Sequence, residues 1–200
     1  MGWMPTMLGV VVVSLAATPV AAKNLREAVF AGGCFWCVEH AFRNTPGVED
    51  VVSGYTGGNV ENPAYEEVAS GRTGHFEAVL VRYDPQQMDF SRLVRIFGEN
   101  IDPLDAGGQF CDRGPQYRSA IFVADAEEEQ IVRQWIAATE ARLGSPVATL
   151  VLPRAPFYPA EAYHQDYAGK NPLRYHLYRQ GCGRDARLKT IWGDKNPAKE

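Results

Sequence analysis

The sequence predicts an α+β fold, a two-layer sandwich in which helices cover one mainly antiparallel sheet. Short apolar segments alternate with amphipathic ones in the order strand, helix, strand, and this order then repeats. Turns that contain glycine and proline separate the segments. Of the 200 residues, 46% are hydrophobic and 22% are charged, which is typical of one globular domain. The net charge of −4 indicates no basic surface, so we expect no binding to nucleic acid.

The first predicted unit is a strand, a helix and a second strand. Residues 28–33 form an apolar segment that runs into a glycine pair. Residues 35–44 place apolar side chains on one helical face, and Pro46 ends this helix because proline cannot continue it. Residues 48–55 are the second strand candidate.

The second predicted unit repeats the first. Residues 76–83 are rich in strand-forming side chains, and residues 119–123 form another short apolar strand. Between them, residues 89–98 carry apolar side chains at the i, i+3, i+4, i+7 spacing of a helix. Two such units in succession match the split β-α-β, or ferredoxin-like, pattern.

The rest of the chain predicts one more helix, one more strand and a tail. Asp125 can cap a helix that ends at Gly144, and residues 147–152 form the last strand. Residues 155–200 show little periodicity. We therefore expect an irregular C-terminal tail that wraps over the surface, with a short helical piece at 173–179.

Residues 1–22 differ from the rest because they contain no charged side chain. Their apolar run is too short to span a bilayer as an ordinary helix, and it ends in the small residues that precede a signal-peptidase site. We predict a signal peptide at 1–22, one folded domain at 23–200, and a periplasmic or secreted product. The alternatives are an inner-membrane anchor facing the periplasm and a buried hydrophobic segment.

The four cysteines are too few for a disulfide scaffold and need separate explanations: Cys34, Cys37, Cys111 and Cys182. Cys34 lies between a predicted strand and a predicted helix. Free N–H groups and the helix dipole stabilise an anion at that place. We therefore expect Cys34 to have a lowered thiol pKa and to act as a nucleophile, the alternative being a buried, inert cysteine.

Residue type and spacing leave three chemical interpretations of these cysteines open. Cys34 and Cys37 could form a thioredoxin-like dithiol pair. The same two thiols with His40 and Cys111 could bind a metal, although a structural metal site usually shows two local ligand clusters and only one is present here. Cys34 could also act alone as a nucleophile, with a distant thiol that resolves the intermediate. The two aromatic residues between Cys34 and Cys37 are typical of an apolar pocket wall.

The sequence Gly-Cys-Phe-Trp at 33–36 resembles the signature of the peptide methionine sulfoxide reductases of the A class. Further segments resemble motifs of this family in the same order: 53–58, 62–65, 70–77, 83–85, 112–119 and 160–165. The resemblance extends over residues 28–192. It implies reduction of the S epimer of methionine sulfoxide, free and in oxidised proteins, without a metal or organic cofactor. It also implies a thioredoxin or thioredoxin-like dithiol donor, and we expect a monomer.

The resemblance further implies a role for each residue of the site. Cys34 supplies the thiolate that attacks the sulfoxide sulfur. Glu77 donates the proton, which at neutral pH requires that burial raise the pKa of its carboxyl group. Tyr65 and Tyr117 donate hydrogen bonds to the sulfoxide oxygen.

The substrate would be held by three further residues. Phe35 and Trp36 match the wall that binds the methyl group, and Asp112 matches a residue that holds the substrate's backbone amide. His164 lies in a matching motif, where it could orient a neighbour.

The resemblance makes Cys182 the resolving thiol, because a sulfenic acid on Cys34 condenses with a second thiol and glycines flank Cys182. Cys37 is the competing resolver, and Cys111 is expected to line the site without a step of its own. Cys37 stands where the family often has glycine, and residues 102–111 also depart from the commoner form. These departures bear on the resolving path.

Overall fold

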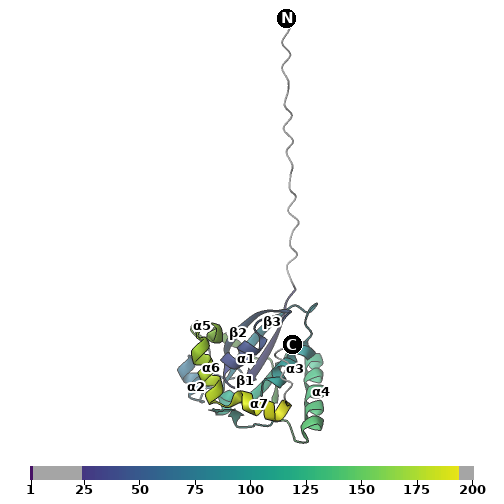
Figure 1. Cartoon of the computed structure of the whole chain (residues 1–200), viewed down its shortest axis with the longest axis vertical. Helices are drawn as coiled ribbons and strands as arrows, with labels where there is room; N and C mark the ends of the chain where they lie inside the picture. Colours follow the sequence, from purple (N-terminus) through teal and green to yellow (C-terminus); the bar gives the residue numbers. More distant parts are fainter. Residues whose placement is uncertain (2–23, 194–200) are drawn as a thin grey trace.

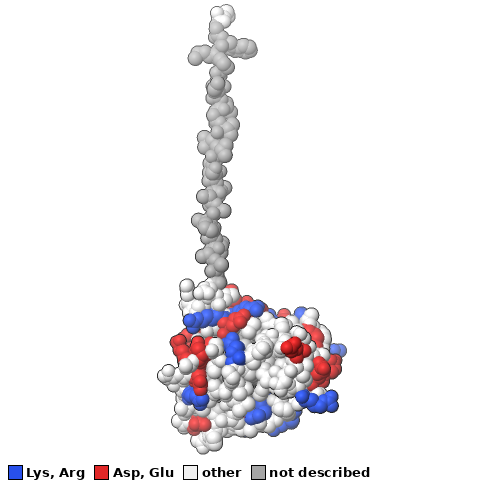
Figure 2. Space-filling view, turned by 180° about the vertical axis from the view of Figure 1, so that it is seen from behind, with Lys and Arg blue, Asp and Glu red and all other residues white. Residues whose placement is uncertain are grey.

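The computed structural model describes residue 1 and residues 24–193 of the chain (Figure 1). The predicted signal peptide or anchor at 1–22 therefore lies outside the described residues, apart from Met1. Within the described part, no helix has the length and apolar character needed to cross a membrane. Figure 2 shows acidic and basic side chains interspersed on one face of the domain.

Eight strands and a series of helices make up the described part. The strands are β1 (Arg26–Gly32), β2 (Val48–Thr56), β3 (Phe76–Tyr83), β4 (Gly108–Gln109), β5 (Asp112–Arg113), β6 (Ser119–Val123), β7 (Leu150–Pro153) and β8 (Phe157–Pro159). The helices are α1 (Phe35–Phe42), α2 (Tyr65–Ala69), α3 (Phe90–Glu99), α4 (Ala126–Leu143), α5 (Tyr167–Lys170), α6 (Pro172–Gly181), α7 (Arg184–Trp192) and a 3-10 turn at Pro115–Tyr117.

Six of the strands form one sheet in the order β7-β6-β1-β3-β2-β8, and β4 pairs with β5 separately. Every pairing in the large sheet is antiparallel except that of β6 with β7. The mixed α+β class and the mainly antiparallel sheet are thus confirmed.

The main core lies between this sheet and helices α1, α3 and α4. The ring of Phe30 on β1 lies 5.1 Å from that of Phe42 on α1 and 5.0 Å from that of Phe97 on α3. A smaller apolar cluster covers the other side of the same strands. Asp125 accepts a hydrogen bond from the N–H of Glu128 at 2.9 Å, so the predicted cap of α4 is confirmed.

The helical piece predicted at 173–179 is confirmed as α6, but the prediction that the rest of the C-terminal tail is irregular is wrong for the described residues. Three helices occupy this region, and in Figure 1 they appear in yellow-green and yellow, with α5 packed on α1. α6 buries one side chain, Tyr175, and α7 buries Arg184 beside Leu188 and Trp192. Helices that bury so few apolar residues show no apolar stripe in the sequence, so periodicity could not reveal α5, α7 or the full length of α6.

Candidate active site

Cys34 lies at the turn from β1 into α1, where it is the residue that precedes the helix. The turn requires Gly33, which has φ +80°, and a Cβ at that position would lie 2.6 Å from the Cβ of Gln109. Cys34 has an extended backbone (φ −52°, ψ 119°), and its carbonyl accepts a hydrogen bond from the N–H of Cys37 at 3.1 Å. Both thiols are free and buried, with Cys34 6% and Cys37 1% exposed.

The prediction that Cys34 has a lowered pKa is wrong for this structure. Burial raises the pKa of the Cys34 thiol well above its ordinary value, and the hydrogen bond with Cys37 and the charges of Glu77 and Asp112 raise it further. The hydrogen bond from Cys34 in turn lowers the pKa of Cys37 to about 6, against the effect of burial. The helix terminus alone therefore does not decide which sulfur is the anion, because desolvation and the second thiol have larger effects.

Glu77 lies on β3, close to the start of α1, and its side chain is buried with 2% exposed. Its carboxylate accepts a hydrogen bond from the backbone N–H of Phe35 at 3.1 Å and another from the Tyr117 hydroxyl. Burial raises the pKa of Glu77 to about 8, and the nearby charges of Asp112 and Cys37 act in the same direction. Glu77 is therefore protonated at neutral pH and can donate a proton.

The two predicted tyrosines lie around the same acid and thiol. Burial raises the pKa of Tyr65 to about 12, and the charges of Glu77 and Cys34 add to this effect. The pKa of Tyr117 is raised for the same reasons, with burial the largest. Both phenols therefore remain hydrogen-bond donors over the physiological pH range.

The aromatic wall contains more rings than the two that the sequence predicted. Trp36 stacks on Tyr167 with the ring centroids 3.7 Å apart, and its indole N–H donates to Nδ1 of His164 at 3.1 Å. The ring of Phe35 lies 4.9 Å from that of His164, and that of Tyr65 lies 4.5 Å from it. His164 thus orients Trp36 and packs against the wall.

Asp112 links three parts of the site. Its carboxylate accepts a hydrogen bond from the backbone N–H of Cys34 and one from the Tyr178 hydroxyl at 2.5 Å. Asp112 therefore fixes the backbone of Cys34 and joins it to α6. Sequence reasoning did not identify Tyr178 or Tyr175, although both lie in the helical piece predicted at 173–179; their i, i+3 spacing on that helix was the available signal.

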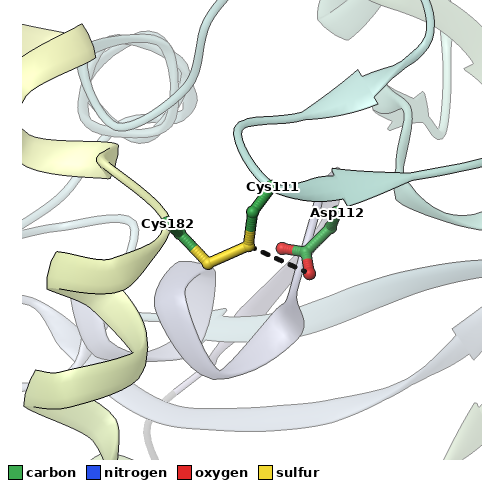
Figure 3. A group of neighbouring side chains, drawn as sticks. All are labelled: Cys111, Asp112 and Cys182. Atoms are coloured by element: carbon green, nitrogen blue, oxygen red, sulfur yellow. Dashed lines mark hydrogen bonds between the residues drawn. A yellow bond between two sulfur atoms is a disulfide. The ribbon is translucent and has the colours of Figure 1, made fainter.

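Cys182 forms a disulfide with Cys111, and the two Cα atoms are 4.8 Å apart. Figure 3 shows this bond next to Asp112, with the sulfur of Cys111 3.8 Å from the carboxylate. Cys111 is exposed and Cys182 half-buried. In this state Cys182 is not a free thiol that could resolve Cys34, and Cys111, which was expected only to line the site, is its partner.

The predicted metal alternative does not match the arrangement of the described residues. The thiol of Cys111 is bonded to Cys182, so it is not available beside Cys34, Cys37 and His40. The described group with metal-ligand spacing is Cys111, Asp112 and Cys182, and two of its three ligand atoms form the disulfide.

The sequence profile of the family described as "Peptide methionine sulfoxide reductase" matches residues 26–196. The chain belongs to this family. It is 49% identical over 182 residues to peptide methionine sulfoxide reductase MsrA 2 of Caulobacter vibrioides, covering 91% of this chain and 93% of the relative. It is 47% identical over 181 residues to peptide methionine sulfoxide reductase MsrA of Bacillus licheniformis, covering 88% and 98%.

Solved structures of the peptide methionine sulfoxide reductases share the fold of this chain. Methionine sulfoxide reductase A of Corynebacterium diphtheriae superposes with a TM-score of 0.68 at 36% identity, covering 76% of this chain and 78% of that one. Reduced Mxr1 from Saccharomyces cerevisiae gives a TM-score of 0.68 at 31% identity, covering 78% and 90%. The family predicted from the sequence is thus confirmed. The matches support an oxidoreductase that reduces methionine sulfoxide, rather than the thioredoxin-like alternative.

Proposed function

We propose that the chain reduces the S epimer of methionine sulfoxide, both free and in oxidised proteins. The observation that carries this proposal is the pairing of a buried thiol, Cys34, with a buried carboxylic acid, Glu77, whose pKa is raised to about 8. A sulfoxide has a polar oxygen that must be protonated as its sulfur is attacked. This pair supplies both the nucleophile and the proton.

In the first step the sulfur of Cys34 bonds to the sulfoxide sulfur while Glu77 protonates the oxygen. The oxygen then passes to Cys34, which becomes a sulfenic acid, and methionine leaves. Tyr65 and Tyr117 donate hydrogen bonds to the oxygen, where negative charge develops. Phe35 and Trp36 exclude water from the methyl group, and their side chains already pack against His164.

Asp112 has a structural part in this proposal as well as the predicted contact to the substrate's backbone amide. The Cys34 N–H and the Tyr178 hydroxyl already donate to its carboxylate. A carboxylate has room for further donors, so a substrate N–H can bind without displacing them.

Resolution of the sulfenic acid is assigned to Cys37 in the oxidation state described. The predicted resolver, Cys182, is bonded to Cys111, whereas Cys37 is a free thiol hydrogen-bonded to Cys34. Cys34 precedes α1 with an extended backbone, so its sulfur is not confined to the helical turn that carries Cys37. Condensation forms the Cys34–Cys37 disulfide and releases water.

The remaining expectations complete the proposal. An external dithiol such as a thioredoxin returns the enzyme to its reduced form, since the cycle consumes two electrons for each sulfoxide.

The enzyme is a monomer that is exported to the periplasm or secreted by means of residues 1–22, or anchored in the inner membrane through them. The core is of the ferredoxin-like split β-α-β type, which the strand order β6-β1-β3-β2 supports.

The proposal is tested by incubating the protein with the separate S and R epimers of methionine sulfoxide and dithiothreitol. Methionine should form from the S epimer, and Cys34→Ser should form none. Cys111→Ser is the control variant and should still form methionine, because it removes a cysteine that is bonded to Cys182 and takes no part in the proposed chemistry. Turnover of the R epimer alone, or full activity in Cys34→Ser, would contradict the proposal.

A further inference from the structure

A line of polar side chains on α6 and α7 connects Cys37 with the surface. The hydroxyl of Tyr175 on α6 is hydrogen-bonded to the sulfur of Cys37. Nη1 of Arg179, one helical turn later, donates to the Tyr175 oxygen at 3.2 Å, and Nε of Arg179 donates to Asp185 at 2.9 Å. Tyr175 is buried, with 6% exposed. None of these contacts is used in the reduction step described above.

The direction of these hydrogen bonds favours a negative charge on Cys37. A guanidinium group can only donate, so the Tyr175 oxygen accepts from Arg179 and its own O–H points to Cys37. Cys37 therefore receives hydrogen bonds from both Tyr175 and Cys34. A sulfur that accepts two hydrogen bonds in a buried site is stabilised as the thiolate.

A second buried cation, Arg184, also favours a negative charge on Cys37. Arg184 is 2% exposed and donates to the carbonyl oxygens of Asn100 at 2.8 Å and Gly32 at 3.4 Å. Its charge acts on Cys37 and Asp112, and among the described residues no carboxylate lies within salt-bridge distance of it. Because a buried charge is costly, an anion on Cys37 stabilises Arg184 in return, in addition to the effect of Asp112.

We propose that Cys37, held as a thiolate by Tyr175 and Arg179, is the proton acceptor that activates Cys34. This inference rests on the proposed function. The proton of the Cys34 thiol passes to Cys37 as the Cys34 sulfur attacks the sulfoxide. When Cys37 later forms the disulfide, the same proton leaves with the sulfenic oxygen, and the proton from Glu77 completes the water. Two electrons pass from the two thiols to the sulfoxide, so atoms and charges balance.

Titratable and charged groups face Cys37 from four parts of the fold. These groups are Cys34 at the start of α1, Glu77 on β3, three residues on α6 and Arg184 on α7; the three on α6 are Tyr175, Tyr178 and Arg179. The hydrogen bond from Cys34 and the charges of the two arginines bring the pKa of Cys37 to about 6 although burial opposes this. Glu77 is neutral at that pH because its pKa is raised to about 8, so it does not oppose the thiolate.

The test is a titration of thiolate ultraviolet absorbance in the protein with the Cys111–Cys182 disulfide intact. Wild type should form one thiolate with a midpoint near pH 6. Tyr175→Phe should raise that midpoint by about one to two pH units, since a hydrogen bond to a charged group is lost. Arg179→Gln, which changes a residue nearer the surface, should also raise this midpoint. Cys37→Ser should remove this thiolate.

Tyr83→Phe is the matched control. Tyr83 is buried like Tyr175 but lies on β3 opposite Arg26, at the end of β1 far from Cys34. Its substitution should leave the midpoint unchanged. A midpoint that stays unmoved in both Tyr175→Phe and Arg179→Gln would overturn the inference. So would a thiolate near pH 6 that persists in Cys37→Ser, since Cys34 would then be activated by the helix terminus alone.

A single-turnover assay separates this inference from the proposed function. Tyr175→Phe should form methionine about tenfold more slowly than wild type at about pH 7, and the difference should shrink as the pH rises past the new midpoint. An equal loss at every pH would indicate a structural defect and would contradict the inference. If wild type itself forms no methionine, the proposed function fails, whereas the titration still tests the charge on Cys37.

Discussion

Replacing Glu77 with glutamine should make the protein more stable and nearly inactive. Glu77 is 2% exposed and its pKa is raised to about 8, so the folded protein binds a proton that the unfolded chain has released at neutral pH. Because the folded state must take up this proton, the free energy of unfolding at neutral pH is lower than it would be without the carboxyl group. Glutamine has nearly the same shape, its carbonyl oxygen can accept from the N–H of Phe35, and it needs no proton.

The size of the effect follows from the two pKa values. Between 4.5 for the unfolded chain and about 8 for the folded protein, the folded state binds more protons, so wild-type stability falls as the pH rises. At about 1.4 kcal/mol per pH unit, the wild type loses about 3 kcal/mol by pH 7 and about 5 kcal/mol above pH 8. Below about pH 4.5 both states are protonated and this loss vanishes.

Urea unfolding of wild type and Glu77→Gln at several pH values measures this difference. The stability advantage of the variant should grow from about pH 5 to about pH 8 and then remain constant. In parallel, methionine formation should fall by about 10²- to 10⁴-fold, because an amide cannot donate the proton. A stability difference that does not change with pH would refute the reasoning, since it would place the carboxyl pKa near its ordinary value.

Three further substitutions test other parts of the structure. Gly33→Ala should lower the free energy of unfolding by about 1–3 kcal/mol in urea and lower activity, because of its positive φ and the contact with Gln109; unchanged stability would contradict this. Trp36→Ala should raise KM for methionine sulfoxide more than it lowers kcat, measured with dithiothreitol, because it removes part of the apolar wall; an effect on kcat alone would exclude a binding role. Cys182→Ser should retain thioredoxin-driven turnover, since we propose that Cys37 resolves Cys34, and loss of that turnover with single-turnover methionine formation intact would return the resolving role to Cys182.

The sequence predicted the parts of the fold in which one face of each element is strongly apolar. Between residues 28 and 143, the longer strands and helices were expected near their observed positions, because β1, β3, α3 and α4 have clear periodicity or caps. The short elements α2, β4 and β5 were not expected. Helices α6 and α7 were not expected in full. They are held by a few buried side chains and by polar contacts such as Tyr178 with Asp112, which leave no periodic apolar stripe.

The sequence alone determined the family, the nucleophile candidate and the residue types of the site, since motif spacing within the chain is enough to recognise them. Only the tertiary structure decided the charges and the partners of the thiols. It pairs Cys182 with Cys111, and it places α6 and α7 so that Tyr175 and two arginines surround Cys37. The physical reason is that pKa values and disulfides depend on burial and on distances of a few ångströms. Those distances arise between residues that lie far apart in the sequence.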